Sequence, residues 1–130
     1  MALLAAGFVW LYVGEPERAI SYLQLYRRIS PLDPRLYLGM AYSYLMLGVP
    51  DQALNWARRA VSRGALWVYA LAPLAGALAQ LGRSGEAKAV AVRLIENNPR
   101  YRVGLEVRKF KPSPARDLLK EGLLKAGFPE

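Results

Sequence analysis

The chain has 130 residues, of which 54% are hydrophobic and 22% are charged, and this composition excludes a disordered chain. It contains no cysteine and no histidine, which excludes disulfides, thiolate or imidazole metal ligands, and the commonest general base. The 18 Lys and Arg residues against 10 Asp and Glu give a net charge of +8, which favours anionic partners without choosing among them. We therefore expect a single-domain cytoplasmic protein that is not an enzyme and carries no metal or cofactor.

A fixed interval of 34 residues separates three turn glycines, Gly14, Gly48 and Gly82. Relative to each glycine, an alanine follows five positions later, a small residue stands seven positions earlier, and a large apolar residue stands four positions earlier. These columns hold Ala19, Ala53 and Ala87; Gly7, Ala41 and Ala75; and Trp10, Tyr44 and Leu78. Pro31 and Pro99 close the first and third repeated units, and Ala65 has the equivalent position in the second.

This pattern resembles the tetratricopeptide repeat (TPR), whose unit is a helix–turn–helix of the same length. The resemblance implies an all-α fold, a right-handed α-solenoid of three TPR helix–turn–helix units over 1–99. The units would span about 1–31, 32–65 and 66–99, and residues 100–130 would form a basic C-terminal extension with a capping helix. Small residues at recurring positions agree with this, because closely packed helices need them where their backbones approach.

Turn and cap residues give the expected helices in chain order. Glycine ends the first helix of each unit, proline or a polar residue opens the second, and Asp33 and Ser84 are predicted to cap the third and sixth helices. The predicted helices are 2–13, 16–29, 34–47, 50–63, 67–81 and 84–96. Pro73 should bend the fifth helix or delay its start to about residue 71.

After Pro99 the interval is lost. A short helix is expected within 101–109, a break follows at 111–114, and Ser113 is predicted to cap a last helix that runs to Lys125 and ends at Gly127. The leucines of this helix should face the stack of hairpins; they are Leu118, Leu119, Leu123 and Leu124.

Two uncharged stretches, 1–14 and 64–82, raise the question of a membrane segment. No basic residues precede the first stretch, and the second contains Pro73 and Gln80 and is explained by the repeat. A membrane partner is therefore not expected. The first helix begins without a polar cap, which suggests a fragment of a longer protein or an end that pairs with another subunit.

In TPR proteins the first helix of each unit lines a concave groove that holds peptides. Carried over by position, the resemblance implies a partner-binding groove of Phe8, Leu11, Tyr12, Arg35, Leu38, Tyr42, Leu45, Met46 and Tyr69. Such an apolar, aromatic wall suits a protein or peptide partner, either an amphipathic helix or an extended apolar segment. The alternative is that upstream sequence, the C-terminal tail or a second copy in a homo-oligomer covers the wall, because large exposed apolar patches are rare in monomers.

Basic residues gather after Pro99, with Tyr101 and Phe110 among them. The candidates for contact with an anion are Arg100, Arg102, Arg108, Lys109 and Lys111. No nucleic-acid-binding motif accompanies them, so nucleic acid is not the expected partner.

Several stretches are similar to the C-terminal TPR region of bacterial class III adenylate/guanylate cyclases and related regulators. They are 30–34, 55–60, 78–83 and 119–130. This resemblance implies a non-catalytic protein–protein interaction or scaffolding module, the regulatory part of a bacterial signalling protein. Two alternatives stay open, a small TPR-type chaperone that sequesters an export substrate and a nucleic-acid-associated protein that uses the basic C-terminal region.

Overall fold

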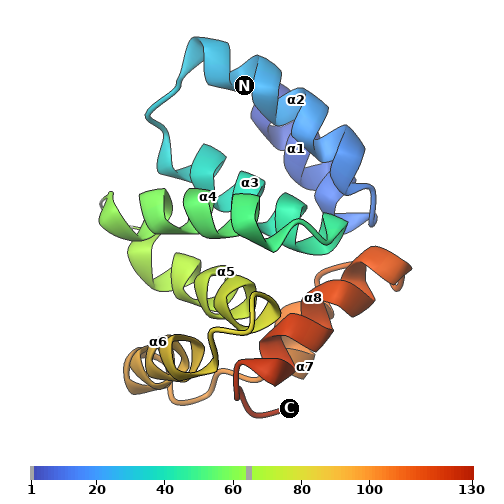
Figure 1. The fold of residues 1–130 in the computed structure, drawn as a ribbon. Helices are drawn as coiled ribbons and strands as arrows, with labels where there is room; N and C mark the ends of the chain where they lie inside the picture. Colours follow the sequence, from blue (N-terminus) through green and yellow to red (C-terminus); the bar gives the residue numbers. More distant parts are fainter. Residues whose placement is uncertain (1, 64–65) are drawn as a thin grey trace.

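The computed structural model describes residues 2–63 and 66–130, and these residues form an all-α structure without strands (Figure 1). The helices are α1 (Ala2–Tyr12), α2 (Pro16–Ile29), α3 (Pro34–Leu47), α4 (Pro50–Ser62), α5 (Trp67–Gln80), α6 (Ser84–Asn97), α7 (Val103–Val107) and α8 (Pro114–Lys125). The predicted boundaries of the first six helices are confirmed to within one residue. Ala65, to which the repeat assigned a place, lies outside the described residues, as do Met1 and Gly64. Among the described helices none is long and apolar enough to cross a membrane.

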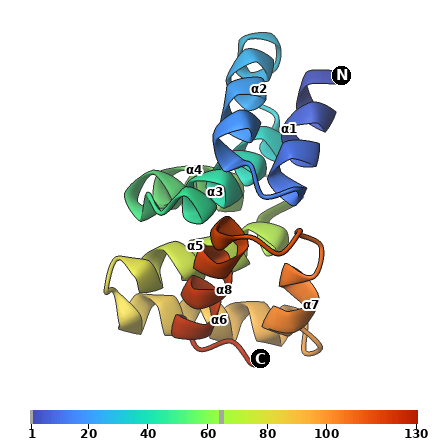
Figure 2. The same cartoon turned by 90° about the vertical axis from the view of Figure 1, so that its right-hand side faces the viewer.

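The first six helices form three successive hairpins, α1/α2, α3/α4 and α5/α6, that follow one another along the molecule (Figures 1 and 2). The first helices of the hairpins also lie side by side, because α3 contacts both α1 and α5. We call the surface that these three helices share the inner face. The last helix, α8, packs across α3 and α5 and carries α7 beside it, so the C-terminal segment lies on the inner face.

The three glycine turns have the same backbone conformation. Gly14, Gly48 and Gly82 have φ angles of 86°, 82° and 79°, a left-handed region that side chains with a Cβ rarely adopt. In each turn the amide of the next residue donates a hydrogen bond of 2.9 Å to a carbonyl five residues earlier. The donor and acceptor residues are Glu15 and Trp10, Val49 and Tyr44, and Arg83 and Leu78. Positions that are equivalent in the sequence are therefore equivalent in the backbone.

Small residues allow the helices of each hairpin to approach closely. Ala19, Ala53 and Ala87 are fully buried, and so are Ala41 and Ala75. At Gly7 a Cβ atom would lie 2.8 Å from a methyl group of Leu23, too close for the pair to stay in place. The recurring small residues are thus a packing requirement.

Two of the three predicted helix caps are confirmed. The side chain of Asp33 accepts a hydrogen bond of 3.0 Å from the amide of Arg35, and Ser113 accepts one of 3.1 Å from the amide of Arg116. The predicted cap at Ser84 is wrong. Arg83 holds the N-cap position of α6, and its guanidinium pairs with Glu86 in the first turn instead.

Two further predictions are corrected in part. The fifth helix starts at Trp67 and continues through Pro73, so its start is not delayed to residue 71. In α8, Leu119 and Leu123 are fully buried, whereas Leu124 is 36% exposed and does not face the hairpins. Leu118 is half-buried and approaches the turn at Gly48, because the buried stripe of a helix covers only part of its circumference.

The arginines of the outer helices pack on tryptophan rings. The guanidinium of Arg27, in α2, lies 5.2 Å from the ring centre of Trp56, and that of Arg59 lies 4.6 Å from the same ring. A cation over an indole face is attracted by the ring's quadrupole. Arg27 therefore links the first hairpin to the second, whereas Arg59 and Trp56 belong to the same helix, α4.

Gly82→Ala tests the left-handed turn, because a Cβ atom at Gly82 would meet nothing within 4 Å and only backbone strain opposes it. We expect a loss of about 1 kcal/mol in the free energy of unfolding, measured by chemical denaturation. Gly85→Ala is the matched control, because its site is equally open and lies inside α6, where alanine should stabilise by up to about 1 kcal/mol. Equal effects of both substitutions would contradict the assigned turn.

Asp33→Asn tests the cap of α3. Hydrogen bonds from Arg35, with a further one from Tyr26, hold the pKa of the Asp33 carboxyl at about 2, below its usual value of 3.8. The ionised form therefore stabilises the fold above pH 4, and this contribution is lost as the pH falls from 3.8 towards 2. Because Arg35 is more than half exposed, we expect the variant to lose only about 1 to 2 kcal/mol at pH 7, and to match the parent near pH 2. A pH-independent difference between the two proteins would contradict this.

Candidate functional site

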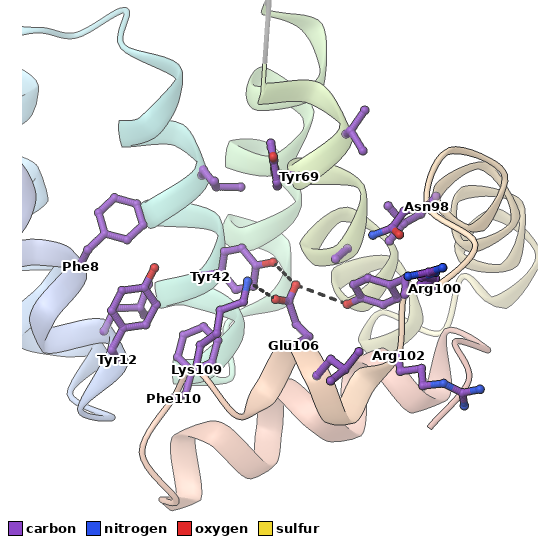
Figure 3. Close-up of a pocket in the computed structure, with 17 residues that line it drawn as sticks. Phe8, Tyr12, Tyr42, Tyr69, Asn98, Arg100, Arg102, Glu106, Lys109 and Phe110 are labelled. Atoms are coloured by element: carbon purple, nitrogen blue, oxygen red, sulfur yellow. Dashed lines mark hydrogen bonds and ion pairs between the residues drawn. The ribbon is translucent and has the colours of Figure 1, made fainter.

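A pocket of about 420 Å³ opens on the inner face (Figure 3). Its walls come from α1, α3 and α5, from the end of α6, and from the segment between Asn98 and Phe110. Six aromatic side chains line it: Phe8, Tyr12, Tyr42, Tyr69, Tyr101 and Phe110. Polar or charged residues also line it: Asn98, Arg100, Arg102, Glu106 and Lys109. The pocket therefore combines apolar rings with a small set of charged groups, as ligand sites usually do.

The carboxylate of Glu106 in α7 is the buried polar centre of the site. Glu106 is 7% exposed, and its Oε1 accepts a hydrogen bond of 2.6 Å from the hydroxyl of Tyr42 and a longer one, 3.4 Å, from Tyr101. Its Oε2 lies 2.7 Å from Nζ of Lys109 (Figure 3). The negative charge is therefore paired and hydrogen-bonded, as burial of a carboxylate requires.

Burial sets the protonation of the two phenols around Glu106. It raises the pKa of Tyr42 well above the usual 10, and the nearby charge of Glu106 raises it further. Burial likewise raises the pKa of Tyr101, again with a contribution from Glu106. Both hydroxyls therefore stay protonated at neutral pH and remain hydrogen-bond donors to the carboxylate.

The chain after α7 holds the inner face through a second set of contacts. The ring of Phe110 lies against Tyr12 and Tyr42, with ring centres 5.3 and 5.9 Å apart. The amide of Lys111 donates a hydrogen bond of 2.6 Å to the carbonyl of Tyr12. Further on, Gln80 of α5 donates to a carbonyl of α8 at 3.0 Å. The sequence left three possible covers for the apolar wall: upstream sequence, the C-terminal tail or a second copy. These contacts show that the C-terminal segment covers part of it.

Six of the nine residues assigned to the groove line the pocket: Phe8, Leu11, Tyr12, Leu38, Tyr42 and Tyr69. Arg35 does not, because its guanidinium is held 2.7 Å from the carboxylate of Asp33. Leu45 and Met46, which are 0% and 1% exposed, belong to the core and present no surface to a partner. The physical reason is that α3 is covered by α1, α2, α4, α5 and α8, which leaves little of it free.

The basic residues that were predicted to contact an anion also fall into two groups, one that lines the pocket and one that does not. Arg100, Arg102 and Lys109 line the pocket, whereas Arg108 and Lys111 are exposed and lie outside it. The sequence had not assigned Glu106, Asn98 or Leu105 to a site. The repeat does not cover Leu105 and Glu106, and a lone glutamate among basic residues gives no sequence signal that it will be buried.

No protein-family model matches the chain, and no curated protein matches it. The candidate site is therefore defined by its own geometry. Within the described part of the chain, no group of three or more carboxylates gathers as a metal site would require. The pocket combines aromatic walls, a paired carboxylate and basic side chains.

Tyr42→Phe tests the anchoring of Glu106. Removal of the hydroxyl leaves a buried carboxylate with one close donor fewer, and we expect a loss of about 1 to 3 kcal/mol in the free energy of unfolding. Tyr69→Phe is the control, because Tyr69 is 65% exposed and its ring lies on the same inner face. Equal stability of the two variants, measured by urea denaturation, would show that the Tyr42 hydroxyl does not hold the segment.

Proposed function

We propose that the protein is a non-catalytic protein–protein interaction scaffold of three TPR units arranged as a right-handed α-solenoid, with residues 100–130 as the capping extension. One observation carries the proposal. The same left-handed turn recurs at Gly14, Gly48 and Gly82, while the first helices of the hairpins lie side by side. Repeated hairpins of this kind stack to give an extended surface for a partner.

The partner surface that we propose is the mouth of the pocket. Apolar side chains stand exposed there, with Tyr69 at 65%, Leu105 at 46% and Tyr12 at 39%. The net charge of +8 favours an acidic partner. We therefore propose that an apolar segment of an acidic protein docks across these three side chains.

The covering of the inner face favours a scaffold over a chaperone. Phe110 and α8 already occupy part of the wall, which leaves less surface for sequestering a long export substrate. Together with the resemblance to C-terminal regions of bacterial class III cyclases, this supports a role as the cytoplasmic, regulatory part of a bacterial signalling protein.

A photo-crosslinking amino acid at Tyr69 tests the docking surface, with the same group at Val92 on α6 as the control. Val92 is 51% exposed and lies outside the pocket. We expect a protein to be captured from Tyr69 and not from Val92. The captured protein is then purified, and its affinity is measured for Tyr69→Ala, Leu105→Ala and Val92→Ala.

The two substitutions at the mouth should each weaken binding by about tenfold, because exposed aromatic and aliphatic anchors commonly carry most of an interface's energy. Val92→Ala should leave the affinity unchanged. If Val92→Ala weakens binding as much as Tyr69→Ala, or if the affinity survives both mouth substitutions, the partner binds elsewhere.

A further inference from the structure

We infer that the pocket also binds a small amphipathic anion, a free molecule with an aromatic or aliphatic body and one carboxylate, sulfonate or phosphate group. This goes beyond the proposed scaffold function, because it assigns a ligand to the space beneath the mouth. It does not depend on the scaffold proposal.

The size and the walls of the pocket suit a small molecule. Its volume of about 420 Å³ falls within the range of about 300 to 1,000 Å³ that is typical of ligand pockets. The lining is mainly aromatic and aliphatic and comes from five parts of the chain: α1, α3, α5, the end of α6, and the segment through α7. A body of one or two rings would exchange water contact for contact with these walls.

The shape of the inner face favours a discrete molecule over a long peptide in this space. Phe110 packs between Tyr12 and Tyr42, and α8 crosses α3 and α5. An extended chain that followed α1, α3 and α5 would meet these groups. A small molecule needs only the space that they leave.

The charges of the pocket favour an anion. Glu106 is already paired with Lys109, so its carboxylate has little attraction left for a cation. Arg100 forms no ion pair with any residue in the described ranges, and it lines the pocket together with Asn98. An amide and an unpaired guanidinium together offer several donors to one anionic group. Arg102 also lines the pocket, but its guanidinium extends away from the other labelled side chains, so we assign the contact to Arg100 (Figure 3).

A ligand in this position would also touch the proposed partner surface. Tyr69 and Leu105 line the pocket and are exposed at its mouth. An occupant would therefore change the surface that a partner meets, which makes the scaffold responsive to a metabolite-sized anion.

Two fluorescent probes with the same aromatic body test the inference. One is 1-anilinonaphthalene-8-sulfonate, and the other is N-phenyl-1-naphthylamine, which lacks the sulfonate. We expect the anionic probe to bind the folded protein with a stoichiometry of one and at least tenfold more tightly than the neutral probe. It should also shift the backbone amide resonances of Tyr69 and Leu105.

Arg100→Gln should weaken the anionic probe at least fivefold and leave the neutral probe unchanged. Arg108→Gln is the matched control, because it removes one exposed cation outside the pocket and should change neither affinity. Far-ultraviolet circular dichroism verifies that both variants are folded. Equal affinities for the two probes, equal losses in the two variants, or binding without shifts at Tyr69 and Leu105 would each overturn the inference. A failed crosslink at Tyr69 would leave it standing.

Discussion

A buried carboxylate is stable only where donors surround it, and the position of Glu106 therefore constrains the whole C-terminal segment. Its donors come from two parts of the chain that are far apart in sequence, Tyr42 in α3 and Lys109 just after α7. The hydrogen bond from Tyr42 holds α7 against the inner face, and the local pair with Lys109 balances the buried charge. Phe110 then reaches the rings of Tyr12 and Tyr42, and the space left between α7 and the hairpins is the pocket.

The sequence predicted the hairpins closely because their signals are local. Glycine at a left-handed turn, proline in a first turn and Asp33 as a cap act within a few residues, and they recur at one interval. Ser84 failed as a cap because Arg83 took the N-cap position and an ion pair with Glu86 stabilised the first turn. A serine near a helix start thus does not ensure that its hydroxyl is used.

The site was less predictable because it depends on packing between distant segments. The positions of Phe8, Tyr12 and Tyr42 followed from the TPR resemblance, but the burial of Met46 depends on how many helices surround α3. Nothing local in the sequence shows that residues 101–111 return to the inner face. The sequence did not decide whether the apolar wall is exposed or covered. In the structure the C-terminal segment covers one part of the wall, and the rest lines a pocket.

The position of the C-terminal segment is tested most directly by the through-space contacts of the Phe110 ring in solution. They are observed as nuclear Overhauser effects in the intact chain. The contacts above predict cross-peaks from the Phe110 ring protons to those of both Tyr12 and Tyr42. Absence of both sets of cross-peaks, in a protein whose circular dichroism is that of a folded helical chain, would place the C-terminal segment elsewhere and contradict the account.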